Sequence, residues 1–238
     1  MGQRRVVAAI AVASVLLLAS CRERVQTYDG SSGGATHADV LTPDGTAAYQ
    51  YANSGGTVTV TPVAGTSGPN LRTVFTPSGV AASTDQESCA TWSDRQGQYV
   101  QMGAALRVRR GSGRLRAITV TQNVYGWRWI FNVHVWDTAS SPPMKEVGQL
   151  DFSKALGVPP VSRLHLCARV IGTTVQAKVW PVGQAEPTWT TRGFVGSATV
   201  AKSWVYAGEA GWYVGHLATG DSAMFSGLTT WDHRIASE

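Results

Sequence analysis

The clearest structural signal in this chain is the run Trp127-Arg-Trp-Ile-Phe-Asn-Val-His-Val-Trp-Asp137. Its odd-numbered positions from Trp127 to Val135 are all apolar, whereas its even-numbered positions include Arg128, Asn132 and His134. Successive side chains of a β-strand point to opposite faces of the sheet. This alternation therefore predicts a strand with one face in a hydrophobic core.

The same alternation continues on both sides of this run. Upstream, apolar residues at every second position from Val100 to Val108 lead to the turn Gly111-Ser-Gly113, and residues 114–122 return, which predicts a hairpin. Downstream, four further segments have the length and pattern of strands: residues 164–170, 175–179, 211–217 and 223–230. No long window has the 3.6-residue period of a helix. We therefore expect an all-β protein, an antiparallel two-sheet sandwich of about ten to fourteen short strands.

The amino terminus has the pattern of an export signal. A basic start, Met1-Gly-Gln-Arg-Arg5, precedes an apolar run and the junction Leu18-Ala-Ser-Cys21. The apolar run is about 13 residues long, shorter than the roughly 20 that span a bilayer as a helix. The junction resembles a bacterial lipobox, which implies that Cys21 is acylated and becomes the first mature residue. An ordinary cleaved signal with an incidental cysteine is the alternative.

These features predict three segments. Residues 1–20 form the lipoprotein signal peptide, residues 21–38 form a flexible tether rich in Gly and Ser, and residues 39–238 form one β-sandwich domain. The expected location is the outer face of the bacterial cytoplasmic membrane, with the lipid on Cys21 as the contact with the membrane.

Charge gives little support for a nucleic-acid partner. The chain has a formal net charge of +5, and removing Arg4 and Arg5 leaves 18 basic against 15 acidic residues, or +3. We expect no nucleic-acid partner and a monomer. Five arginines nevertheless surround one turn, and they could contact anionic lipid headgroups or acidic wall polymer, or form a solvated edge that resists strand pairing: Arg107, Arg109, Arg110, Arg114 and Arg116.

Two cysteines remain once Cys21 is assigned to the lipid. In an oxidising compartment an even pair favours a disulfide, so we expect Cys89 to bond Cys167. Two buried free thiols are the alternative. No cysteine and histidine cluster has the spacing of a zinc site.

A second motif connects the chain to a known fold. The segment Val175-Gln-Ala-Lys-Val-Trp-Pro-Val-Gly-Gln-Ala-Glu-Pro-Thr-Trp189 resembles a signature of concanavalin A-like (laminin-G-like) jelly-roll domains in secreted actinobacterial and phage-tail proteins. The resemblance extends over roughly residues 98–231. It implies a jelly-roll sandwich of the lectin and glucanase type, a fold that hosts many activities.

Two stripes of side chains are candidate ligand-binding residues. A polar stripe that ends in an indole suits a sugar, because the indole covers the apolar ring face while amide and guanidinium groups bond the hydroxyls. If the sheet is curved, we expect the stripes on its concave side, and a partly buried polar network is the alternative. The two stripes comprise Arg128, Asn132, His134 and Trp136 on one strand and Gln176, Lys178 and Trp180 on another.

Signals for catalysis are weaker. Glycoside hydrolases of this fold place two carboxylates on one strand in a Glu-x-Asp-x-x-Glu pattern, and the matching strand here offers only Asp137. We expect no cofactor. The resemblance leaves room for a calcium ion, but the sequence identifies no ligands for it. The leading hypothesis is a non-catalytic carbohydrate-binding lipoprotein. The alternatives are a polysaccharide-active hydrolase or lyase of the same fold and an envelope protein–protein interaction module.

Overall fold

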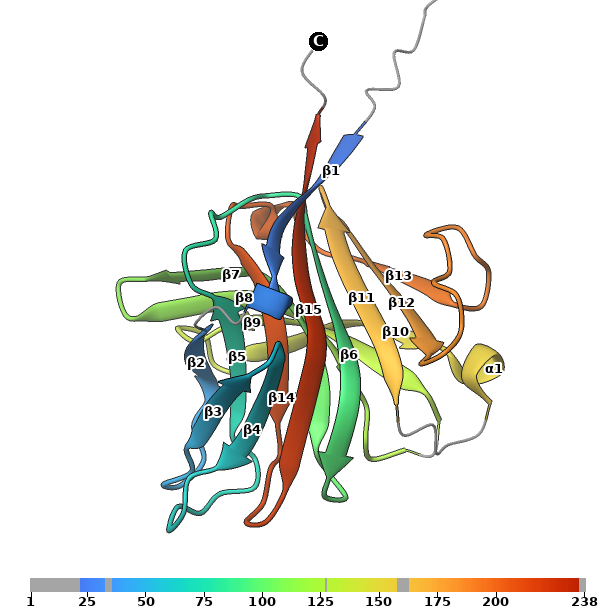
Figure 1. Cartoon of the computed structure of the whole chain (residues 1–238). Coiled ribbons are helices and arrows are strands. Elements are labelled where there is room, and N and C mark those ends of the chain that lie inside the picture. Colours follow the sequence, from blue (N-terminus) through green and yellow to red (C-terminus); the bar gives the residue numbers. More distant parts are fainter. Residues whose placement is uncertain (1–21, 33–35, 127, 158–162, 236–238) are drawn as a thin grey trace, which may run out of the picture.

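A computed structural model describes residues 22–32, 36–126, 128–157 and 163–235. Two antiparallel β-sheets pack face to face over these residues (Figure 1). This confirms the predicted all-β antiparallel sandwich. The predicted signal peptide and Cys21 lie outside the described residues.

The first sheet, called sheet A, contains eight strands within the described residues. Strand β1 (Arg22–Asp29) pairs with β15 and lies outside the linear order of the other seven strands. The other seven follow in spatial order: β13 (Val195–Thr199), β12 (Thr174–Pro181), β11 (Leu164–Ile171), β6 (Gln86–Gln96), β15 (Ser222–Ile235), β4 (Thr57–Pro62) and β3 (Tyr49–Ser54).

The second sheet, called sheet B, contains seven strands in the same part of the chain. Its spatial order is β10 (Met144–Asp151), β9 (Ile130–Asp137), β8 (Arg114–Gln122), β7 (Gln101–Gly111), β14 (Glu209–Gly215), β5 (Arg72–Pro77) and β2 (Thr36–Thr42).

Helices are few and short. They are the single-turn α1 (Ser153–Leu156) and the 3₁₀ segments Gly30–Ser32 and Lys202–Trp204. Across the described residues, none of the helices has the length and apolar character needed to cross a membrane.

The main core lies between the two sheets and explains the alternation of β9. Phe131, Val133 and Val135 are buried in this core, while Asn132, His134 and Trp136 point to the outer face of sheet B. The strand begins at Ile130, later than the sequence pattern suggests, and Trp129 just before it is also part of the core. Stacked and edge-on rings fill the centre, including those of Phe75, Trp92, Trp212 and Phe225.

The predicted hairpin is present as β7 and β8. Gly111 pairs with Arg114, and the two residues between them, Ser112 and Gly113, have φ angles of 50° and 72°. A two-residue turn with both φ angles positive matches the right-handed twist of the flanking strands. Glycine adopts this conformation without steric cost, which explains Gly113, whereas Ser112 is a non-glycine residue with a positive φ.

The start of the described chain differs from the flexible tether expected over residues 21–38. Residues 22–29 form β1, an edge strand paired with the end of β15, and Arg22 lies opposite Ile235. The reason is tertiary: Arg24 hydrogen-bonds Glu87 of β6 and stacks on Trp231 at 3.8 Å. Local composition could not reveal partners so distant in the sequence.

The expected disulfide is formed. Cys89 of β6 and Cys167 of β11 are direct cross-strand neighbours, and their sulfurs are bonded. The bond closes a loop with a sequence separation of 78 residues.

Sheet B curls toward its outer face. One groove of about 550 Å³ is lined by residues 39–43 of β2 and the loop after it, and also by Leu115, Thr138 and Pro143 from the β8 and β9 side of the sheet. The outer face of sheet B is therefore the concave side. A second, smaller hydrophobic cluster fills part of it: Leu41, Val74, Ala105, Val108, Leu115, Ala117, Trp136 and Tyr213.

Candidate functional site

The predicted stripe on β9 lies on the concave side, but its indole is buried. Trp136 is 1 % exposed within the second hydrophobic cluster. Its Nε1 donates a hydrogen bond of 2.9 Å to Oγ1 of Thr119 on β8. Trp136 is therefore covered in this structure and offers no open ring face to a ligand.

Asn132 and His134 sit beside Trp136 among polar groups without partners. Within the described residues, Asn132 Oδ1, His134 Nδ1 and Thr121 Oγ1 are buried side-chain atoms with no hydrogen-bond partner. Thr121 of β8 lies directly opposite Asn132. Burial and the charge of Arg72 lower the pKa of His134 to about 4, so its ring is neutral at pH 7. Buried polar atoms normally have a hydrogen-bond partner. These three atoms therefore form a strip of buried polar groups with unsatisfied hydrogen bonds.

Arg128 lies before β9 rather than on it. Its side chain is exposed and forms an ion pair with Asp151 of β10. It belongs to the rim of sheet B, and the strand does not bring it into line with Asn132 and His134.

The second predicted stripe lies on the opposite outer face of the sandwich, that of sheet A. Lys178 is 3 % exposed, forms an ion pair with Glu186, and places Nζ 4.5 Å from the ring centre of Trp189. Gln176 accepts two hydrogen bonds from Arg169. Trp180 packs with the disulfide and stacks on His165. The structure does not join the two stripes into one surface.

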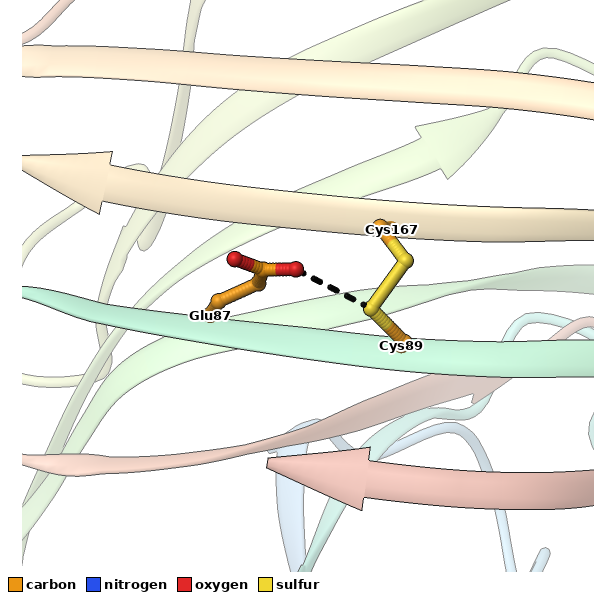
Figure 2. Close-up of side chains that lie close together, drawn as sticks. All are labelled: Glu87, Cys89 and Cys167. Carbon is orange, nitrogen blue, oxygen red and sulfur yellow. Dashed lines mark hydrogen bonds between the residues drawn. A yellow bond between two sulfur atoms is a disulfide. The ribbon is translucent and has the colours of Figure 1, made fainter. Parts of the chain in front are cut away.

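One cluster on the outer face of sheet A has the composition of a metal site. Glu87, Cys89 and Cys167 place three potential ligand atoms within 4.8 Å of one another (Figure 2). Metal-binding cysteines act as thiolates, whereas both sulfurs here are consumed by the disulfide. The Glu87 carboxylate is also occupied, because it bonds Arg24 and His233. The cluster is a structural tie between β1, β6, β11 and β15.

Sequence reasoning missed an aromatic pocket at the end of sheet B where β7 begins. Tyr99 and Tyr125 stack with ring centres 5.3 Å apart, and they remain 45 % and 63 % exposed. The pocket has a volume of about 340 Å³. We call this the aromatic pocket, and its lining is Pro69, Asn70, Gln98, Tyr99, Tyr125, His216, Ala218 and Asp221.

His216 supports the exposed ring of Tyr125. Its Nδ1 lies 3.2 Å from the Tyr125 hydroxyl, and the two rings meet edge to face. Burial and the charge of Arg72 lower the pKa of His216 to about 4, so the ring is neutral at pH 7. His216 also adopts a φ of 60°, an uncommon conformation for a non-glycine residue that is often found at functional sites.

The register of the β7–β8 hairpin explains how this pair meets. Gly103 lies opposite Thr121. Tyr99 stands four positions before Gly103, and Tyr125 stands four positions after Thr121, so this register places the two tyrosines opposite each other. The predicted turn alone could not reveal the pair, because it pairs Gly111 with Arg114 and the register shifts between Leu106 and Arg109.

The groove lies at the other end of β7, next to the hairpin turn. Two carboxylates stand near it, from Asp39 and Glu209, and both bond the same guanidinium of Arg110 at 2.7 Å. Glu209 also accepts a hydrogen bond from Thr76. The concave side thus has an exposed aromatic pocket at one end and a groove with paired charges at the other.

Comparison with known proteins supports the fold. No protein-family model matches the chain, and no curated protein matches its sequence. The structure is similar to the CBM2 module of Lactobacillus casei BL23 phage J-1 evolved Dit, with a TM-score of 0.54 and 8 % identity over 91 % of this chain and 99 % of that one. It is similar to the Ca²⁺-bound exoplasmic/lumenal domain of VIP36, with a TM-score of 0.55 and 9 % identity over 90 % and 91 %.

A third similar structure is Bacillus licheniformis β-glucanase, with a TM-score of 0.54 and 6 % identity over 88 % of this chain and 99 % of that one. These likenesses confirm the jelly-roll sandwich that the sequence resemblance implied. At such low identity they establish the fold alone.

Proposed function

We propose that this chain is an exported lipoprotein, acylated on Cys21 at the outer face of the bacterial cytoplasmic membrane, whose β-sandwich binds carbohydrate. The binding surface is the concave side of sheet B, and the aromatic pocket at one end of it makes the main contact with the sugar. The observation that supports this proposal is the exposed, stacked pair of Tyr99 and Tyr125 beside polar side chains.

The chemistry of the aromatic pocket suits a sugar. A pyranose ring has an apolar face that packs on an aromatic ring, while its hydroxyls need donors and acceptors at the edge. Asn70 and Gln98 line the pocket with exposed amide side chains, and Asp221 adds a carboxylate. A rigid aromatic anchor with a few polar groups is the usual composition of a small-ligand site.

Comparison of two Tyr125 variants tests the role of the ring. Wild-type protein on a glycan array identifies the ligand, and titration calorimetry then compares Tyr125→Ala with Tyr125→Phe. Loss of the ring should weaken binding roughly tenfold, since an aromatic contact contributes about 1 kcal/mol or more. Tyr125→Phe keeps the ring and loses only the contact with His216, so it should stay near wild type. Absence of any glycan ligand would overturn the proposal.

Two further measurements separate the parts of the proposal. Release of reducing sugar from mixed polysaccharides would show that the chain hydrolyses glycans and does not only bind them. Membrane fractionation of wild type and Cys21→Ala tests the anchor: the wild type should sediment with membranes, and the variant should lose its acyl chains and the sedimentation.

A further inference from the structure

The tip of the β7–β8 hairpin carries a pocket whose lining side chains are almost all cationic. The pocket has a volume of about 280 Å³ and is distinct from the aromatic pocket, which lies at the opposite end of β7. We call it the arginine pocket, and its lining is Arg109, Arg110, Gly111, Ser112, Arg114 and Arg116.

Two of its four arginines already have carboxylate partners. Arg110 pairs with Asp39 and Glu209. Arg114 pairs with Asp137, and hydrogen bonding to Arg114 lowers the pKa of that carboxyl to about 2. These pairs neutralise half of the arginine pocket.

Arg109 and Arg116 form no ion pair with any described carboxylate. They are direct cross-strand neighbours in the hairpin register, an arrangement in which like charges destabilise a sheet. Both guanidiniums lie over the ring of Tyr206, at 5.7 and 4.5 Å. Burial raises the pKa of Tyr206 to about 12, so its neutral phenol supplies no compensating negative charge at pH 7.

Arg116 is held firmly in place. Its guanidinium lies 4.2 Å from the ring centre of Trp204, and its Nη2 donates to the carbonyl of Ser203 at 3.0 Å. Its Nε is buried without an acceptor among the described residues. A fixed guanidinium loses little entropy on binding, and its planar fork matches the oxygens of an oxyanion.

We propose that the arginine pocket binds a tetrahedral oxyanion, phosphate or sulfate, between Arg109 and Arg116. An anion there removes the repulsion between the two guanidiniums and gains charge-assisted hydrogen bonds. This inference goes beyond carbohydrate binding and does not depend on it.

The same phosphate chemistry is available from a free anion or from a lipid headgroup. A series of contacts connects the arginine pocket to the start of β1. Arg22 pairs with Asp85, Arg107 lies 3.6 Å from Asp85 and donates to the Trp204 carbonyl at 2.6 Å, and Trp204 packs on Arg116. The experiment therefore tests a free anion and a lipid headgroup separately, in two arms.

The first arm titrates full-length mature protein with sodium sulfate or phosphate against sodium chloride of equal ionic strength. Two-dimensional NMR of arginine Nε–H groups is the readout. The Arg116 signal should shift in a saturable manner with sulfate or phosphate and remain unchanged with chloride. The second arm measures sedimentation with phosphatidylglycerol vesicles against phosphatidylcholine vesicles, and higher ionic strength should weaken this binding.

Variants at the pocket decide the result. Arg109→Gln alters an exposed side chain and should weaken anion binding roughly tenfold, as expected for loss of one charged hydrogen bond. Arg116→Lys keeps the charge but loses the fork, and it should also weaken binding. Arg163→Gln removes an exposed arginine just before β11 and is the matched control.

Binding in either arm that falls in Arg109→Gln but not in Arg163→Gln supports the proposal and identifies the source. Absence of binding in both arms, or binding that is equal in all variants, overturns it. A glycan-array result, positive or negative, leaves this outcome unaffected.

Discussion

Arg24 binds Glu87 through two hydrogen bonds, 2.6 Å from Nη2 to Oε1 and 3.2 Å from Nε to Oε2, and so attaches the first strand to the middle of sheet A. The Glu87 side chain is fully buried, and His233 Nε2 lies 2.9 Å from Glu87 Oε2. Burial alone would raise the pKa of Glu87, but the hydrogen bond with His233 and the charge of Arg24 outweigh it and lower the pKa below its ordinary value of 4.5.

The first prediction concerns Glu87→Gln. The depressed pKa means that the ionised carboxylate stabilises the fold above about pH 4.5 and that this contribution declines as the pH falls below that value. The variant should lose about 1–3 kcal/mol at pH 7. Urea unfolding at several pH values measures both effects. Glu146→Gln, at a 43 % exposed side chain, is the control and should change stability little. Equal stability of wild type and Glu87→Gln would contradict the assignment.

The second prediction concerns the disulfide. Removal of a cross-link over a separation of 78 residues should cost about 4 kcal/mol in the chain-entropy model. Urea unfolding with and without reductant should show this loss in wild type and no reductant effect in the Cys89→Ser, Cys167→Ser double variant. A reductant effect that persists in the double variant would point to another cause.

The third prediction compares two threonines on the same face of β8. Thr119 accepts a hydrogen bond from Trp136, so Thr119→Val should cost about 1–2 kcal/mol by leaving the indole N–H without a partner. The Thr121 hydroxyl is buried without a partner, so Thr121→Val should leave stability unchanged or raise it by about 1 kcal/mol. Chemical denaturation distinguishes them, and equal losses would show that Thr121 has a partner such as a bound water.

The fourth prediction concerns Trp136, which the sequence presented as an exposed sugar platform. Because it is 1 % exposed within the second hydrophobic cluster, Trp136→Ala should lower the free energy of unfolding by about 3–5 kcal/mol. Tyr125→Ala, at a 63 % exposed ring, should barely change it. A Trp136→Ala protein that keeps full stability but no longer binds glycan would support the ligand-binding role that the sequence predicted for Trp136.

The fifth prediction concerns His134 and pH. Its folded-state pKa of about 4 lies below the ordinary value of 6.5, so the unfolded chain binds the proton more tightly. Stability should therefore be full above about pH 6.5 and decline as the pH falls toward 4, by roughly 2–3 kcal/mol for this residue. NMR titration of the His134 ring should show no protonation at pH 6. A midpoint near 6.5 would contradict the burial argument.

Local pattern was sufficient for some features of the fold. Alternation around Phe131 and Val133 predicted a strand with one face in the core, and Gly111-Ser-Gly113 predicted the hairpin. Both depend on residues within a few positions of one another. The Cys89–Cys167 bond was also predicted, because few alternatives remained once Cys21 was set aside.

Apart from the disulfide, contacts between residues distant in the sequence were not predicted. Trp136 is buried in a cluster that includes Leu41, from a strand at the opposite edge of sheet B. Residues 22–29 form a strand because Glu87 and Trp231 bind Arg24, although their own composition is polar. Curvature of a sheet and pairing of charges across it do not appear in a local pattern.

The position of β1 has a mechanical consequence for a protein held at a membrane. Arg22 is both the residue after Cys21 and a paired residue of β1, next to Asp85 at one end of β6. Gln98 and Tyr99 of the aromatic pocket follow the other end of β6, roughly 30 Å away at 3.3 Å per residue. If Cys21 is acylated as proposed, residues 22–29 form β1 and would leave no long flexible linker between the lipid and the sandwich. The aromatic pocket would then lie on the side away from the bilayer and would bind ligands at a fixed distance from it.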